Sequence, residues 1–175
     1  MLTEKDRAIY GCDAVFIGHW EPTTESMITE LRREGIDVRV WGPGWRRSGL
    51  PDRGRIVPLT GHEYVKALAS AKLCLGLLSK WNRNRCTLRT FEIPAIGGLL
   101  FTERTDDHLK YFVEDHEAVY FDTKEEMVDK ARYYLEHDDV RQNVALAGHQ
   151  RCVSSRYTHL DRMRSVMAEI TRDSQ

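Results

Sequence analysis

Short apolar runs alternate with helical patterns along almost the whole chain. Six runs have the character of strands: residues 13–20, 37–41, 55–59, 72–79, 99–102 and 118–122. Strands that alternate with helices form parallel sheets with helices on both faces. The order therefore predicts an α/β fold, a Rossmann-like doubly wound parallel sheet of about six strands. No linker or repeat divides the sequence, so we expect a single domain over residues 1–175.

The run at 72–79 is the most apolar of these strands. Its sequence, KLCLGLLS, is almost continuously apolar and does not alternate with polar residues. A parallel strand that is buried on both faces has this pattern, whereas a strand with one wet face alternates. We therefore expect 72–79 at the centre of the sheet.

Helical patterns fill most of the intervals between the strands. The segment 23–34 has a threonine cap at Thr23 or Thr24 and a stop at Gly35. The remaining expected helices are 62–71, a short helix ending near Gly97, 106–113, 124–137 and most of the chain after it. The segment 45–54 is rich in Arg, Gly and Pro and is expected to be a loop.

The composition argues against several classes of partner. The formal net charge is −1, so bulk electrostatics do not indicate a nucleic-acid partner. No apolar run approaches the ~20 residues of a membrane span, and the charged N-terminal segment lacks the apolar core of a signal peptide. We therefore expect a cytoplasmic protein with no membrane span.

The cysteines do not form a recognisable framework. Cys12, Cys74, Cys86 and Cys152 lie far apart, and no CxxC pair is present. Histidines also lack the close spacing of metal ligands. We expect neither a disulfide framework nor a metal site.

The most informative segment for function is a basic loop that runs into a short helix. Four basic side chains follow one another with no acid among them: Lys80, Arg83, Arg85 and Arg89. One carboxylate, Glu92, follows in an apolar setting. Basic side chains and helix N-terminal amides suit phosphates, and a carboxylate accepts hydrogen bonds from a sugar diol. Charge runs are usually solvated faces, so the spacing alone favours the plainer alternative of an amphipathic helix with a salt-bridged glutamate.

Loops at the ends of the first two strands carry further candidates. Ligands of doubly wound sheets bind at the carboxyl ends of the strands, where Gly18-His19 and Trp41-Gly42 lie. Gly18 would let the backbone approach a phosphate, although a glycine after a strand is usually a turn. Trp41 could stack on a base, with packing under the loop as the alternative. The GxGxxG and GxxxxGK[ST] fingerprints are absent, which argues against a standard NAD site or P-loop.

An ordered set of motifs marks a resemblance to a known family. The strongest is TLRTFEIPAIGGLLFTE at 87–103, preceded by the helix-strand stretch at 63–84 and by FIGHWEP and VRVWGPGW near the first two strands. In this set the chain resembles the C-terminal domain of CgeB-like glycosyltransferases, GT-B enzymes of the "glycosyl transferases group 1" type. The resemblance runs across nearly the whole sequence.

The resemblance implies a role in binding a nucleotide-sugar donor. GT-B enzymes have two Rossmann-like domains, and the donor binds mainly to the C-terminal one. By this likeness the N-terminal acceptor domain is absent from the chain, or a partner chain supplies it. The exposed domain face could then form a homodimer. The resemblance implies no organic cofactor, and no metal is expected.

The resemblance also assigns residues. Retaining members have two glutamates at a fixed spacing, and the second, which contacts the ribose, matches Glu92. The first matches Asn84, whose amide can hydrogen-bond but carries no charge. Relatives often have a basic residue after the first-strand glycine, and here that stretch has none, so neutralising the diphosphate falls to the basic loop. We expect catalytic roles for Asn84 and Arg89, and donor contacts from Gly18, His19, Trp41, Gly42, Arg83, Arg85, Thr87 and Glu92.

Two alternatives remain open at this point. One is a non-catalytic binding or interaction module that keeps the Rossmann-like fold and uses an exposed face to hold a partner. The weaker one is a flavodoxin-like signalling domain, which would need an acidic pocket where this chain has Gly18 and His19. Titration with sugar nucleotides separates the first alternative from a donor-binding domain.

Overall fold

A computed structural model describes residues 2–52, 56–155 and 157–173. Within these ranges the chain forms a five-stranded parallel sheet in the order β2-β1-β3-β4-β5. The strands are β1 Cys12–Ile17, β2 Val38–Trp41, β3 Ala71–Leu75, β4 Leu100–Glu103 and β5 Val119–Phe121. The helices are α1 Glu4–Tyr10, α2 Pro22–Arg33, η1 Trp45–Arg47, α3 Gly61–Ser70, α4 Arg89–Ile96, α5 Asp106–Tyr111, α6 Lys124–Glu136, α7 Asp138–Ser154 and α8 His159–Asp173. The predicted α/β class and parallel sheet are confirmed.

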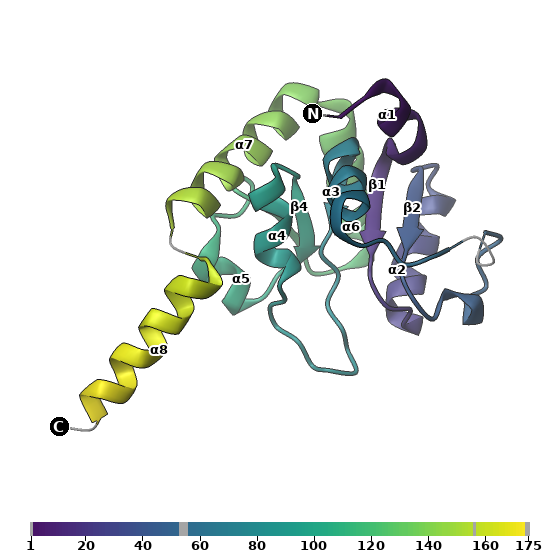
Figure 1. Ribbon diagram of the computed structural model, residues 1–175. Coiled ribbons are helices and arrows are strands. Elements are labelled where there is room, and N and C mark those ends of the chain that lie inside the picture. Colours follow the sequence, from purple (N-terminus) through teal and green to yellow (C-terminus); the bar gives the residue numbers. More distant parts are fainter. Residues whose placement is uncertain (1, 53–55, 156, 174–175) are drawn as a thin grey trace.

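Helices cover both faces of the sheet (Figure 1). Successive residues of a strand point to opposite faces, so Phe16 and Val15 of β1 belong to different cores. The core that contains Phe16 packs against α2 and α6, and the core that contains Val15 packs against α1, α3, α4 and α5. Burial on both sides explains the continuous apolar composition of the strands.

The apolar run at 72–79 supplies the central strand, as expected, but the strand ends at Leu75. The Gly76 N–H still donates to the Phe101 carbonyl at 2.9 Å. Two residues later the Leu78 N–H donates instead to the carboxylate of Glu103 at 3.0 Å. The chain therefore leaves the sheet there, and the loop that extends below the sheet in Figure 1 begins.

The prediction of a sixth strand at 55–59 is wrong for residues 56–59, which form no strand. Arg55 lies outside the described residues. The segment is irregular and makes one backbone bond toward β2, from the Gly42 N–H to the Val57 carbonyl at 3.1 Å. Pro58 has no N–H to give to a ladder, which favours a single contact over a paired strand. The sheet consequently has five strands and not six.

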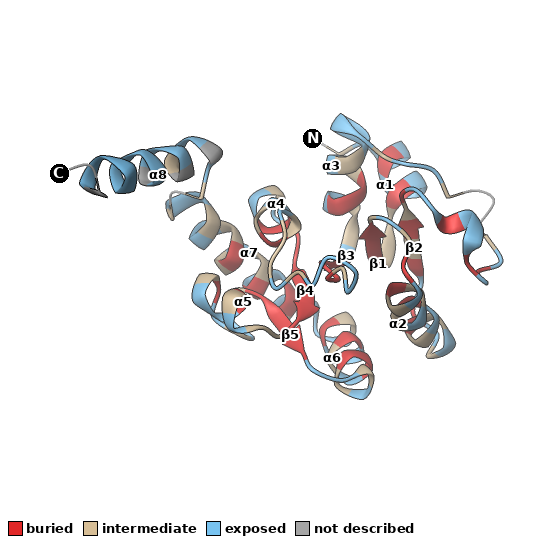
Figure 2. Cartoon of the chain, turned by 90° about the horizontal axis from the view of Figure 1, so that it is seen from below, coloured by how far each residue is buried: buried red, intermediate tan, exposed pale blue. Residues whose placement is uncertain are grey.

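Helix α8 extends away from the body of the protein (Figure 1) and is exposed along most of its length (Figure 2). Several apolar side chains at helical spacing are exposed on it: Leu160, Met163, Val166, Met167 and Ile170. Among the described residues, no helix is both long and apolar enough to cross a membrane.

A network of charged side chains joins the end of β4 to α6. Arg104 donates to Glu126 at 2.8 Å and also bonds Glu114, which in turn accepts from Lys130 at 3.0 Å. The hydrogen bond from Arg104 holds the pKa of Glu126 at about 2, below its ordinary value of 4.5. Networks of this kind contribute more than isolated surface pairs.

Replacing Arg104 by methionine should destabilise the protein at neutral pH and change its response to acid. A carboxyl with a depressed pKa stabilises the fold above its ordinary value and loses this contribution as the pH falls toward the folded value. We expect Arg104→Met to lower Tm by about 2–4 °C at pH 7, from roughly 1 kcal/mol of lost pairing. The difference between the two proteins should shrink as the pH falls from about 4.5 to about 2.5.

Circular dichroism melts over this pH series check the expectation. The control is Arg132→Met, which removes a single half-exposed pair with Glu34 and should change Tm little at any pH. A constant difference between Arg104→Met and the native chain across the series would contradict the assignment.

Candidate functional site

One cavity of about 580 Å³ lies at the carboxyl edge of the sheet. The loops that follow β1, β2 and β3 border it together with the first turns of α3 and α4. Six of the ten residues expected at a donor site line this cavity: Gly18, Gly42, Asn84, Thr87, Arg89 and Glu92. The structure thus brings together residues that are more than seventy positions apart, because parallel strands end at the same edge.

A close backbone approach shapes one wall of the cavity. The Gly18 N–H donates to the Trp41 carbonyl at 2.8 Å, and the Trp45 indole N–H donates to the Gly18 carbonyl at 2.9 Å. Gly42 has a φ of 137°, and a Cβ there would lie 2.0 Å from the Gly18 carbonyl oxygen. A Cβ on Gly18 would lie 2.6 Å from the Phe16 ring and 3.0 Å from Arg89 Nη1, so this glycine is needed for packing within the protein, and its amide is also already used.

Arg89 provides a half-buried positive charge beside this wall. Its Nη1 donates to the Ile17 carbonyl at 2.8 Å, and its guanidinium lies 5.5 Å from the centre of the Phe16 ring. Burial lowers the pKa of the Arg89 guanidinium from its ordinary value. Its buried Nε has no hydrogen-bond partner, and among the described residues no carboxylate forms an ion pair with this side chain. The Glu92 carboxylate in the same cavity opposes this pKa shift, so it offsets part of the charge without forming an ion pair, and the partly buried cation still attracts anions.

Glu92 faces the same cavity from the first turn of α4. The Tyr64 hydroxyl, which comes from α3, donates to Glu92 Oε2 at 2.7 Å. Burial, and then the bond to Glu92, raise the pKa of Tyr64. Tyr64 was not among the residues expected from the sequence. It lies 28 positions from Glu92, and no local pattern joins the two.

The other four expected residues lie outside this cavity. His19 and Arg83 are exposed on their loops. Trp41 packs against Tyr10 with ring centres 5.9 Å apart, which is the packing alternative that the sequence left open. Arg85 forms ion pairs with two carboxylates that begin α5: Asp106 at 2.6 Å and Asp107 at 3.4 Å.

Two buried carboxylates hold the base of the loop between β3 and α4. Glu103 accepts from the Leu78 N–H, as described above, and Glu21 accepts from the Lys80 N–H at 2.9 Å. Each satisfies a backbone donor that has left the sheet. The sequence did not reveal either residue, because its partner lies at least 25 positions away.

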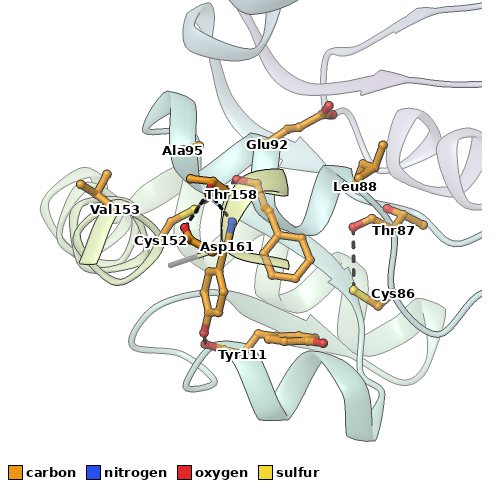
Figure 3. A pocket seen from close by; sticks show the side chains of 12 residues that line it. Cys86, Thr87, Leu88, Glu92, Ala95, Tyr111, Cys152, Val153, Thr158 and Asp161 are labelled. Atoms are coloured by element: carbon orange, nitrogen blue, oxygen red, sulfur yellow. Dashed lines mark hydrogen bonds between the residues drawn. The ribbon is translucent and has the colours of Figure 1, made fainter. Parts of the chain in front are cut away.

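A second, larger cavity of about 890 Å³ lies on the other side of the first turn of α4 (Figure 3). Aromatic rings form much of its wall, with Phe91 4.9 Å from Tyr111 and 5.1 Å from Tyr157 between ring centres. None of the described residues that line it is basic. The smaller cavity is therefore the better candidate for a phosphorylated ligand, since it contains the cation of Arg89.

The part of the chain that the structure describes contains no cluster of potential metal ligands. No group of three His, Cys, Asp or Glu side chains is placed to hold an ion. All four cysteines are free thiols. The expectation that catalysis needs no metal stays a prediction.

Comparison with known families decides the relationship of the chain. A family model described as glycosyl transferase-like matches residues 22–168. The chain belongs to this family. A comparison with curated proteins finds no significant match.

Solved structures share the fold at low sequence identity. The C-terminal domain of a glycosyl transferase group 1 family protein (LpcC) from Francisella tularensis has a TM-score of 0.61 and 13% identity, over 86% of this chain and 89% of that one. A Listeria monocytogenes protein assigned as a UDP-N-acetylglucosamine 2-epimerase has a TM-score of 0.58 and 13% identity, over 84% of this chain and 42% of that one. The spinosyn forosaminyltransferase SpnP has a TM-score of 0.53 and 15% identity, over 96% and 47%.

The glycosyl transferase-like chain therefore has the fold of a C-terminal GT-B domain. It spans less than half the length of the Listeria protein and of SpnP. The presence of an epimerase among the neighbours agrees with the general rule that a fold supports several chemistries, so activity must be argued from the site.

Adding one methyl group at Gly42 should disrupt the wall of the cavity. The Gly42→Ala Cβ meets the Gly18 carbonyl oxygen, and the backbone conformation is itself unfavourable for alanine. We expect a loss of roughly 2–4 kcal/mol in the free energy of unfolding, measured by urea denaturation.

The matched control is Gly35→Ala. Gly35 also has a positive φ, of 81°, but open space surrounds its Cβ position, so the expected loss is about 1 kcal/mol. Equal losses in the two variants would mean that the contact between Gly18 and Gly42 adds nothing.

Proposed function

We propose that the chain is the donor-binding domain of a GT-B glycosyltransferase and that a nucleotide-diphosphate sugar occupies the 580 Å³ cavity. The observation that carries the proposal is the meeting of the unpaired Arg89 cation and the Glu92 carboxylate in this one cavity. A diphosphate needs the first, and a ribose diol can use the second. Membership of the glycosyl transferase-like family supports the same conclusion.

Each part of the donor has a candidate partner. The diphosphate would lie against the Arg89 guanidinium at the N-terminal end of α4, where the helix dipole favours negative charge. The ribose hydroxyls would donate to Glu92. The Asn84 amide would bond the sugar or the diphosphate.

These contacts suggest how the domain contributes to transfer. Cleavage of the glycosidic bond leaves negative charge on the departing diphosphate, and the Arg89 cation and the α4 dipole would stabilise that charge. The anomeric carbon of the sugar would form a bond to the oxygen of an acceptor hydroxyl held by another domain, and the proton of that hydroxyl would leave with the departing diphosphate. The order of motifs at 16–22, 38–45, 63–84 and 87–103 supports a CgeB-like subtype within the family.

One observation favours a second candidate, a non-catalytic interaction module. The apolar side chains along α8 are exposed, as a surface that holds a protein partner would be. The same surface also suits contact with an N-terminal acceptor domain or with a second copy, so it does not by itself oppose a donor-binding role.

Isothermal titration with UDP, GDP, ADP and TDP tests the proposal, and Glu92→Ala locates the site. Loss of two hydrogen bonds donated by ribose hydroxyls to a carboxylate costs roughly 1.5–3 kcal/mol, so the variant should bind about 10- to 100-fold more weakly.

The control is Glu136→Ala, which removes an exposed carboxylate at the end of α6, a helix that packs against the opposite face of the sheet from α3 and α4. It should bind as the native chain does, and thermal melts should show that both variants fold. Unchanged affinity in a folded Glu92→Ala protein would place the nucleotide elsewhere. Failure of all four nucleotides to bind would favour the interaction module.

The chain by itself should bind a nucleoside diphosphate and transfer no sugar. Transfer requires donor and acceptor held together with water excluded, and one Rossmann-like unit supplies one wall of such a cleft. Turnover assays with radiolabelled sugar nucleotides check this, with a panel of simple sugars as trial acceptors and the chain at high concentration. Robust transfer would mean that two copies complete the cleft or that the two-domain analogy fails.

A further inference from the structure

The hydroxyl of Tyr64 has no part in the assignments above, although it lies in the same cavity. Tyr64 belongs to α3 and Glu92 to α4, so their hydrogen bond of 2.7 Å joins the two helices across the cavity wall. Tyr64 is half-buried, whereas Glu92 is exposed. The hydrogen bond therefore links the half-buried ring of Tyr64 to the exposed side chain of Glu92, which is less restrained by packing.

The bond leaves Glu92 with one oxygen engaged and one available. Tyr64 donates to Oε2, and among the described residues none donates to Oε1. A carboxylate has about four lone-pair sites, so three remain for a ligand. Glu92 also borders the larger cavity of about 890 Å³, and Figure 3 shows its side chain turned away from the other labelled side chains there.

Fixing Glu92 before the ligand arrives changes the energetics of recognition. An unrestrained glutamate has several rotamers and loses that freedom when a ligand binds. A hydrogen bond within the protein removes part of that loss in advance, which is preorganisation. The ordinary pKa of a tyrosine, 10.0, already keeps its hydroxyl protonated at physiological pH, and burial raises the pKa of Tyr64 further. A phenylalanine would keep the ring but not this restraint.

We propose that Tyr64 is a positioning residue that presents Glu92 to a vicinal diol, so that the cavity selects a ribonucleotide over its 2′-deoxy counterpart. The inference rests on the proposed function. Two adjacent hydroxyls need two acceptor sites at a fixed orientation, which a restrained carboxylate supplies. A 2′-deoxyribose has only one of these hydroxyls and gains less from the restraint.

The test compares the native chain with Tyr64→Phe by isothermal titration. The probes are UDP, GDP and ADP, each paired with its 2′-deoxy form. We expect the native chain to bind the preferred ribonucleotide about 10-fold more tightly than the deoxy form. In Tyr64→Phe the ratio should fall to about 3-fold or less, because the ribonucleotide binds more weakly and the deoxy form binds within about 2-fold of its native affinity.

Two further variants isolate the contact. Tyr134→Phe is the matched control. Tyr134 lies on α6 and packs in the other core, and its hydroxyl also donates to a carboxylate, Asp115 Oδ1, at 3.1 Å. It should leave the ratio unchanged. Tyr64→Phe made in a Glu92→Ala background should likewise leave that variant's ratio unchanged, as expected if Tyr64 acts only through Glu92.

The outcomes separate this inference from the proposed function. An unchanged ratio in Tyr64→Phe overturns the inference and leaves donor binding in place. An equal loss of affinity for both forms assigns Tyr64 a structural role and also overturns it. If none of the six nucleotides binds to the native chain, the proposed function and this inference fail together.

Discussion

The side chain of Arg89 is the contact on which the arrangement of the cavity depends. It begins α4 and reaches back to the carbonyl of Ile17 at the end of β1, with its guanidinium over Phe16. This single residue therefore fixes the helix that carries Glu92 relative to the strand that precedes Gly18. Strand β1 in turn pairs with both β2 and β3. The contact from Arg89 therefore ties α4 to the middle of the sheet.

The alternation of strands and helices was enough to predict the class of fold and the central position of β3. Apolar pattern is a local property, and it identified β1, β2, β4 and β5 within a few residues of their bounds. Pairing is not local, which is why 56–59 has a strand-like sequence and yet makes only one backbone bond to the β2 side. Helix α1 was also missed, although Thr3 and Asp6 form a capping box that the sequence displays.

The candidate site was predictable to the extent that it follows from topology. Gly18 and Glu92 could be expected to converge because both follow strands that end at one edge of the sheet. Tyr64 and Glu21 could not, because each meets its partner through tertiary packing of elements far apart in sequence. Arg85 shows the opposite error. It lies next to the site in sequence, but its side chain pairs with two carboxylates of α5 and does not line the cavity.

Several unfavourable features gather around this one cavity. Of three buried polar side-chain atoms without a partner among the described residues, two belong to residues that line it: Thr87 Oγ1 and Arg89 Nε. Gly42, in the same wall, has a backbone conformation that other residues rarely adopt. The cations of the Arg104 network, by contrast, are paired with carboxylates.

Local rules of stability are satisfied in that network and broken at the cavity, and such exceptions concentrate where a protein binds its ligand. A sequence selected for stability alone would pair Arg89 directly with a carboxylate, as Arg104 is paired, and would not leave it only the longer-range influence of Glu92. An incoming diphosphate would supply a direct counter-charge, so the feature that costs stability at the cavity is the one that would bind the donor.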